Sequence, residues 1–90
     1  MKLKIVDPRG QPIELECNPT DKLSSLISDY ENKYKALFPK IKIIPNTLLF
    51  DGEAFREEDY DTNLEDLGLE DGFMLSSSDN YNGGLISFIF

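Results

Sequence analysis

Several oxygen-bearing side chains in the middle of the chain have a spacing that could bind calcium. An EF loop takes ligands from positions 1, 3, 5, 7 and 12, among others. The same spacing joins Asp59, Asp61, Asn63, Glu65 and Glu70. However, Leu64 stands where that loop needs glycine for its sharp turn, and no pair of helices is predicted to flank it. We therefore expect an acidic, solvated loop here and no metal site.

The remaining reactive side chains do not form a catalytic group. Cys17 could act as a nucleophile, but the sequence has no histidine to activate it, and the alternation in IELEC places it inward with Leu15. The run EEDYD offers carboxylates, yet acid–base catalysis needs a cleft that perturbs their pKa values, and a chain of 90 residues has little room for one. We expect neither enzymatic activity nor a cofactor.

The pair Gly83-Gly84 near the end of the sequence allows two interpretations. Asn82-Gly83 is a turn signal, and the following LISFIF is rich in β-branched and aromatic residues, so the glycines could lead into a last buried strand. Alternatively, the pair is the chemical end of a protein that is trimmed before use. A loose LISFIF would then be an aggregation hazard, because it is β-prone, uncharged and free of proline.

The charge of the chain is unevenly distributed. The net charge is −8, with eight basic against six acidic residues in 1–45 and one against eleven in 46–90. Phosphate backbones would be repelled, so we expect no nucleic acid as a partner unless the lysines at 33, 35, 40 and 42 act alone. No apolar run is long enough for a membrane span or a signal peptide, and the single cysteine excludes an internal disulfide. These features predict a cytoplasmic or nuclear protein.

The first half of the sequence predicts a hairpin followed by a helix. Apolar and polar residues alternate in KLKIVD and IELEC, as in half-buried strands, and the linking DPRGQP favours a turn. Thr20 or Asp21 can cap the helix, and Pro39 ends it. The apolar stripe of this helix comprises Leu23, Leu26, Ile27, Tyr30, Tyr34 and Leu37.

The second half predicts short strands and an acidic loop. KIKII and TLLF are expected to form a linker strand and a third core strand, and Asp51-Gly52 turns the chain into EAF. We expect the leucines of the acidic loop, Leu64, Leu67 and Leu69, to pin it to the core. If FMLSSS is the central strand, Ser77 points inward. A serine buries less apolar surface there than an aliphatic side chain would, which costs about 2 kcal/mol or more.

Together these elements predict an α+β fold of the β-grasp type: a single domain, 1–90, with a mixed sheet of four to five strands packed on one amphipathic helix. Three segments carry a family resemblance in the same order: LSSLISDY on the helix, LLFDGE at the third strand, and LEDLGLEDG before the last strand. The chain resembles ubiquitin-like proteins, most closely the SUMO branch.

This resemblance implies work by protein–protein contact, with two alternatives. In the first, the chain is a modifier precursor: a protease removes LISFIF after Gly84, and activating and conjugating enzymes attach the new terminus to targets. Glycine suits that role, because it allows the close backbone approach of a narrow channel. In the second, the chain is a non-conjugated docking domain for a receptor of ubiquitin-like domains, and LISFIF is its final core strand.

The resemblance also indicates partner-binding residues. Leu49 falls where ubiquitin-like proteins present an apolar side chain to partners, and it would face outward if Leu48 and Phe50 face the helix. The alternative is that Leu49 is an ordinary core leucine. Glu14 and Glu16 occupy the region where the SUMO branch has a basic groove, so a basic partner would suit this face better. An assembly subunit that docks through its acidic face is a third possibility. We expect a monomer, although an apolar last strand at a sheet edge could pair with a second copy.

Overall fold

The protein is described by a computed structural model, which places residues 1–78; Gly83, Gly84 and LISFIF lie outside the described residues. The strands are β1 (Lys2–Val6), β2 (Pro12–Glu16), β3 (Thr47–Phe50), β4 (Glu53–Ala54) and β5 (Met74–Ser78). The helices are α1 (Leu23–Leu37) and the short 3₁₀ helix η1 (Glu57–Asp61).

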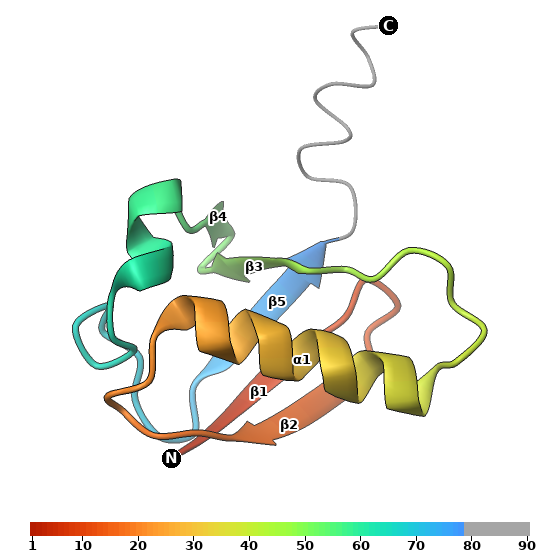
Figure 1. Ribbon diagram of the computed structural model, residues 1–90, viewed down its shortest axis with the longest axis horizontal. Helices are drawn as coiled ribbons and strands as arrows, with labels where there is room; N and C mark the ends of the chain where they lie inside the picture. The colour runs from red at the N-terminus through yellow and green to blue at the C-terminus, as the bar shows by residue number, and fades with distance from the viewer. Residues whose placement is uncertain (79–90) are drawn as a thin grey trace, which may run out of the picture.

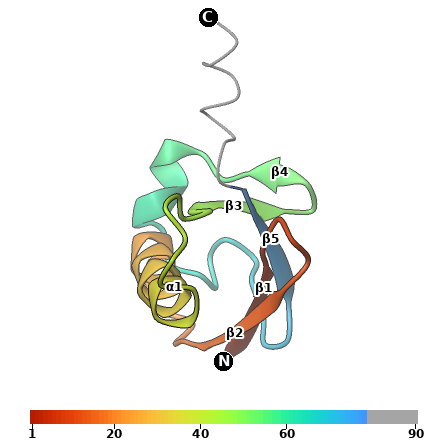
Figure 2. The same cartoon turned by 90° about the vertical axis from the view of Figure 1, so that its right-hand side faces the viewer.

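The five strands form one mixed sheet that packs against α1. Their order is β2-β1-β5-β3-β4, so β5 lies at the centre. β1 pairs with β5 in parallel, and the other three pairings are antiparallel. α1 crosses one face of this sheet, and no other element of residues 1–78 covers the opposite face (Figures 1 and 2). The predicted α+β β-grasp fold is confirmed.

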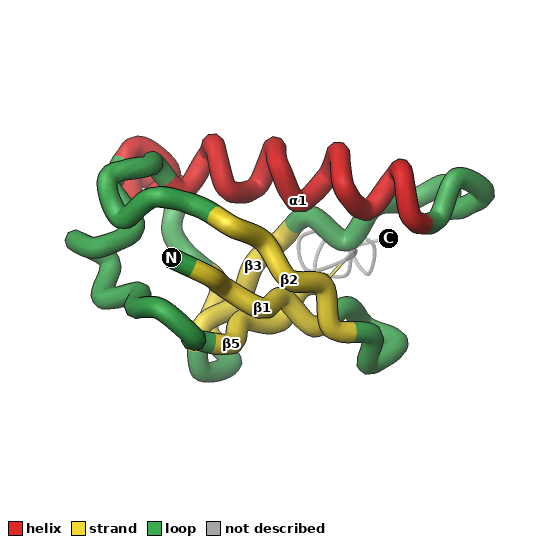
Figure 3. The backbone as a smooth tube through the Cα atoms, turned by 90° about the horizontal axis from the view of Figure 1, so that it is seen from below, coloured by secondary structure: helices red, strands yellow, loops and turns green. Residues whose placement is uncertain are grey.

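The core lies between α1 and the sheet. Figure 3 shows the helix and the strands as two layers seen from below. The predicted hairpin is confirmed, with Leu3 opposite Leu15 and Ile5 opposite Ile13. The buried apolar residues are Leu3, Ile5, Ile13, Leu15, Cys17, Leu23, Leu26, Tyr30, Tyr34, Leu48, Leu64, Leu69 and Leu75.

The start of α1 differs from the prediction. Neither Thr20 nor Asp21 caps it: the N-cap residue is Lys22, which makes no side-chain capping bond. The Asp21 carboxylate instead accepts a hydrogen bond from the Asn18 N–H at 2.9 Å. The Leu23 N–H donates to the Thr62 carbonyl at 3.1 Å, so a distant loop satisfies a first-turn donor that the side-chain cap was expected to serve.

The end of α1 also differs in part. The helix ends at Leu37, two residues before Pro39, as predicted. Leu37 was predicted to lie on the buried stripe, but it is 52% exposed because the chain turns away at Phe38, which packs against the Tyr34 ring instead. Stripe residue Ile27 is half-buried.

The segment after Pro39 is not a strand, so the prediction for KIKII was wrong. Ile41 and Ile44 are half-buried against the core, whereas Ile43 is 64% exposed. These five residues carry the chain from the end of α1 back to β3, and two prolines, Pro39 and Pro45, flank them. Ile41 and Ile44 therefore act as separate anchors of a loop.

The predicted Asp51-Gly52 turn and the predicted packing of the acidic loop agree with the structure. Asp51 and Gly52 both have positive φ (55° and 83°) and join β3 to β4 in a tight hairpin, a conformation that glycine adopts without strain. The acidic loop is pinned as expected, with Leu64 and Leu69 buried and Leu67 half-buried.

Candidate protein-interaction surfaces

Leu49 lies on the outer face of the sheet, away from α1. It pairs in register with Ser76 of β5 and Ala54 of β4, and it is half-buried, whereas its neighbour Leu48 is buried against the core. Phe50, on the same side of β3 as Leu48, is half-buried and packs near Phe73, with ring centroids 5.9 Å apart. The role of Leu49 in binding stays a prediction.

Leu49 is one of the residues that line a mainly apolar hollow on this outer face, which Asp51 and Gly52 also border. Its volume is about 330 Å³, and its lining includes Val6, Leu49, Met74, Leu75 and Ser76. The Met74 side chain is 60% exposed beside it. Methionine is flexible and polarizable, so this rim can adapt to an apolar side chain of a partner.

Glu14 and Glu16 are exposed on the edge strand β2, where register places them opposite Lys4 and Lys2. The Glu16 carboxylate accepts a hydrogen bond from the Met1 amino group at 2.9 Å, and this contact raises the pKa of that amine. The Glu14 carbonyl accepts a hydrogen bond from Lys33 Nζ of α1. A lysine thus lies across the free edge of β2, and binding by these glutamates remains a prediction.

Two tyrosines of α1 form hydrogen bonds across the core with polar side chains of other elements. The Tyr30 hydroxyl and Ser77 Oγ are 2.8 Å apart in a buried hydrogen bond. Ser77 therefore faces inward, as the sequence predicted for a central strand, but its hydroxyl is satisfied. Burial raises the pKa of Tyr30 to about 12, against a smaller opposing effect of the Ser77 hydrogen bond.

The second tyrosine belongs to a charged network. Tyr34 donates to Asp7 Oδ2 at 2.8 Å, and Arg9 Nη2 donates to both Asp7 Oδ2 (3.2 Å) and the Tyr34 hydroxyl (3.1 Å). Asp7 Oδ1 also accepts the backbone N–H groups of Arg9 and Gln11. Burial alone would raise the pKa of Asp7, but these hydrogen bonds outweigh it and lower the pKa.

This network was not predicted from the sequence, although two signals could have indicated it. An aspartate that opens a D-P-x-G turn commonly accepts the backbone N–H groups that follow it. A tyrosine on a buried helix stripe needs a partner for its hydroxyl. Together they predict a contact between Asp7 and one of the two helix tyrosines.

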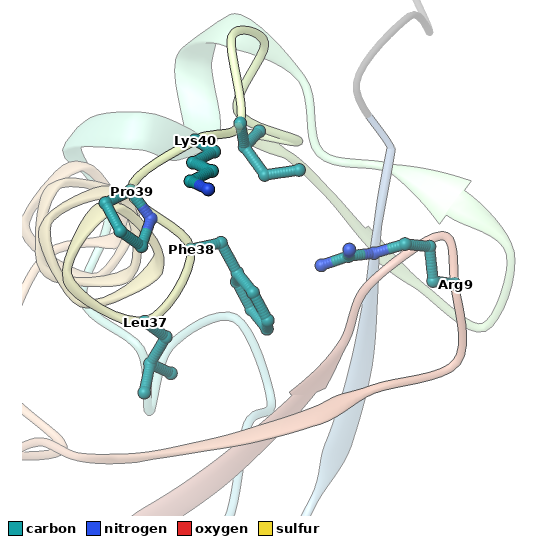
Figure 4. A pocket seen from close by; sticks show the side chains of 6 residues that line it. Arg9, Leu37, Phe38, Pro39 and Lys40 are labelled. Carbon is teal, nitrogen blue, oxygen red and sulfur yellow. The ribbon is translucent and has the colours of Figure 1, made fainter.

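A second hollow lies beside this network, at the C-terminal end of α1 (Figure 4). Its volume is about 380 Å³. It is lined by Arg9, Leu37, Phe38, Pro39, Lys40 and Ile41. The Arg9 guanidinium carbon lies 4.5 Å from the centre of the Phe38 ring, in a cation–π contact.

The acidic segment and Cys17 have structural partners. The Asp59 carboxylate accepts the Arg56 N–H at 2.8 Å, and Asp61 forms an exposed ion pair with Lys22 at 2.9 Å. Within residues 1–78, no three potential metal-ligating side chains come together. Burial raises the pKa of the Cys17 thiol.

None of the helices in this part of the chain is long and apolar enough to cross a membrane.

A known protein family matches most of this chain. The model of the ubiquitin-2-like Rad60 SUMO-like family matches residues 1–76. The chain belongs to this family. The predicted resemblance to ubiquitin-like proteins near SUMO is therefore confirmed, and the match ends inside β5, before Gly83.

A solved structure supports the ubiquitin-like fold. The C-terminal ubiquitin-like domain of human 2'-5'-oligoadenylate synthetase-like protein superposes with a TM-score of 0.69 and 19% sequence identity, over 90% of this chain and 84% of that one. At this identity the likeness concerns the fold alone. The search of curated proteins gave no significant match.

Proposed function

We propose that this ubiquitin-like domain is a protein-modifier precursor, processed after Gly84 and conjugated to target proteins through that glycine. The observation that carries the proposal is the position of β5. It fills the centre of the sheet between β1 and β3 and ends at Ser78, upstream of the diglycine. The proposal places the protein in the cytoplasm or nucleus, with activating and conjugating enzymes and a processing protease as partners.

The sheet of the described residues has no vacant inner position for a further strand. All three inner positions are occupied by β1, β5 and β3, so an additional strand could pair only at the free edges of β2 or β4. The inward Ser77, which argued against FMLSSS as the central strand, has its hydroxyl paired with Tyr30. The desolvation penalty of a buried hydroxyl is thereby largely avoided. Both points favour LISFIF as a removable segment.

The spacing to the diglycine also supports conjugation. Residues 79–82 separate the end of β5 from Gly83. An activating enzyme must bring the terminal carboxylate into a narrow channel, and two residues without a Cβ allow close backbone approach there.

Thioester formation tests the proposal directly. The chain ending at Gly84 is incubated with ATP and a panel of purified activating enzymes for ubiquitin-like proteins. We expect a band on non-reducing gels that disappears with thiol reductant. The matched controls are the same chain with Gly84→Ala and the full chain through Phe90, neither of which should form the band. Absence of a thioester across the panel would contradict the modifier proposal.

The docking-domain alternative rests on the hollow around Leu49. This hollow of about 330 Å³ could receive an apolar side chain of a partner, and such binding does not require a free C-terminus. On this alternative, Leu49→Asp abolishes binding to a receptor of ubiquitin-like domains, whereas Leu37→Asp on the helix side does not. Isothermal titration of the full-length chain with such receptors, together with the absence of any thioester, would favour this reading.

A further inference from the structure

The hollow at the end of α1 combines an apolar lining with exposed apolar neighbours. Leu37, Phe38 and Ile41 line it, and Leu37 is 52% exposed. Ile43, two residues beyond Ile41, is 64% exposed. Single exposed aliphatic residues are common, but Leu37 lines a concavity of about 380 Å³ together with Phe38 and Ile41. Such a surface suits the insertion of a large apolar side chain.

The charge around this hollow is positive. Residues 32–50 contain four lysines and no acidic residue, whereas residues 51–72 contain ten acidic residues and one arginine. Asp7 balances the charge of Arg9, so the net positive charge at the hollow comes from Lys40, with Lys35 and Lys42 close in sequence. An acidic ligand would be attracted to this end of the molecule and repelled by the 51–72 segment.

Arg9 adds directed hydrogen-bond donors. Its Nε and Nη2 donate to Asp7 and Tyr34, and among residues 1–78 Nη1 has no hydrogen-bond partner. The side chain is half exposed, and the Phe38 ring lies beneath it. The guanidinium is thus already held in position, so little side-chain entropy is lost when it meets a carboxylate.

We propose that this hollow docks an acidic peptide segment of a partner protein, which inserts one large apolar side chain while its carboxylates meet Lys40 and Arg9. A concave site favours a peptide side chain over a flat lipid surface, and the net charge of −8 disfavours an anionic membrane. The proposal rests only on described residues and does not depend on conjugation. It adds a second interaction surface, on the helix side of the sheet.

Chemical-shift mapping on the ¹⁵N-labelled full-length chain tests the site. The probe is a short synthetic peptide with one phenylalanine flanked on both sides by glutamates. We expect shifts at residue 9 and at residues 37–41, and weaker binding as salt rises. Two matched peptides, one with the phenylalanine replaced by alanine and one with the glutamates replaced by lysines, should bind far more weakly.

Paired variants separate the charge from the apolar contact. One exposed ion pair contributes up to about fivefold in affinity, so the charge reversal Lys40→Glu should weaken binding by about fivefold or more. Lys4→Glu makes the same charge change on the outer face of the sheet and should have no effect. Leu37→Ser should weaken binding as well, while Met74→Ser, another exposed apolar residue, should not. Equal thermal melts would show that all four variants fold.

Three results would overturn the proposal. The first is the absence of shifts at residues 9 and 37–41 at millimolar peptide. The second is stronger binding to vesicles of anionic phospholipid than to the peptide, which would assign the surface to a membrane. The third is a set of shifts at the same residues that depends on protein concentration without peptide, which would assign it to a second copy of this chain.

Discussion

Different interactions hold the two ends of α1 in place. At its N-terminal end, the acidic loop packs buried leucines, Leu64 and Leu69, against the helix and core. At its C-terminal end, Tyr34 is held by the charged pair Asp7–Arg9, and the leucine that closes the helix is exposed. One end is sealed by apolar burial; the other is held by hydrogen bonds and left open.

Backbone contacts reinforce the sealed end. The Leu64 N–H donates to the Asp21 carbonyl at 2.8 Å, and the Leu23 N–H donates to the Thr62 carbonyl. Loop and helix start therefore satisfy each other. Most carboxylates of the loop are exposed, and Asp61 pairs with Lys22, so their charge does not disturb the packing.

At the open end, apolar side chains stay exposed because polar contacts, rather than burial, hold the surrounding residues in place. The guanidinium of Arg9 is positioned by Asp7, Tyr34 and Phe38 rather than by burial, and the hollow beside it stays accessible. We therefore expect substitutions at the sealed end to affect stability and those at the rim of the open end to affect binding.

The sharpest stability contrast is between two leucines. Leu64→Ala removes a fully buried side chain and should lower the free energy of unfolding by about 3 kcal/mol, since a core cavity remains. Leu37→Ala should change it by less than about 0.5 kcal/mol, because the side chain is mostly exposed. Urea unfolding followed by circular dichroism measures both. Equal losses would show that the two ends do not differ in this way.

Asp7 should matter nearly as much as the leucine, for an electrostatic reason. Asp7→Ala leaves the Tyr34 hydroxyl and two backbone N–H groups without their acceptor, which should cost about 2–3 kcal/mol in the free energy of unfolding. Chemical denaturation at neutral pH gives this value. A loss below that of an ordinary surface substitution would remove the network from the account.

The pH dependence of stability has a predicted sign. The pKa of Asp7 is lowered in the folded state, so its contribution is complete above the ordinary value of 3.8 and is lost as pH falls through the folded pKa. Acid titration of the wild-type chain should show this loss, and Asp7→Asn should show less of it. Identical acid transitions in both chains would contradict the assignment.

The neutral counterpart of that network should contribute less. Tyr30→Phe and Ser77→Ala each leave one buried hydroxyl without its main partner and should each cost about 1 kcal/mol. The double variant should lose less than the sum, because both hydroxyls are then absent. A double-mutant cycle by urea unfolding measures the coupling; strict additivity would mean that the bond contributes nothing.

Much of the fold was predictable because it depends on local pattern. The alternation in the first two strands, the stripe from Leu23 to Tyr34, the Asp51-Gly52 turn and the buried leucines of the acidic loop each follow from spacing and turn chemistry. The motifs LLFDGE and LEDLGLEDG then indicated the family.

What failed depends on tertiary contacts that pattern does not contain. KIKII alternates like a strand, but no neighbouring strand pairs with it in the described sheet. Asp21 is a good cap residue, yet the Thr62 carbonyl serves the first-turn donor from another part of the chain. Of the candidate sites, the outward position of Leu49 was predictable from alternation, whereas the hollow beside Arg9 depends on where Phe38 turns.

The most direct test of the central claim, that the fold is complete before the diglycine, is urea unfolding of the chain ending at Gly84 beside the full chain. We predict cooperative transitions that differ by less than about 0.5 kcal/mol, because β5 already fills the centre of the sheet between β1 and β3. A truncated chain that is unfolded, or less stable by more than about 2 kcal/mol, would show that residues 85–90 belong to the core and would contradict the account.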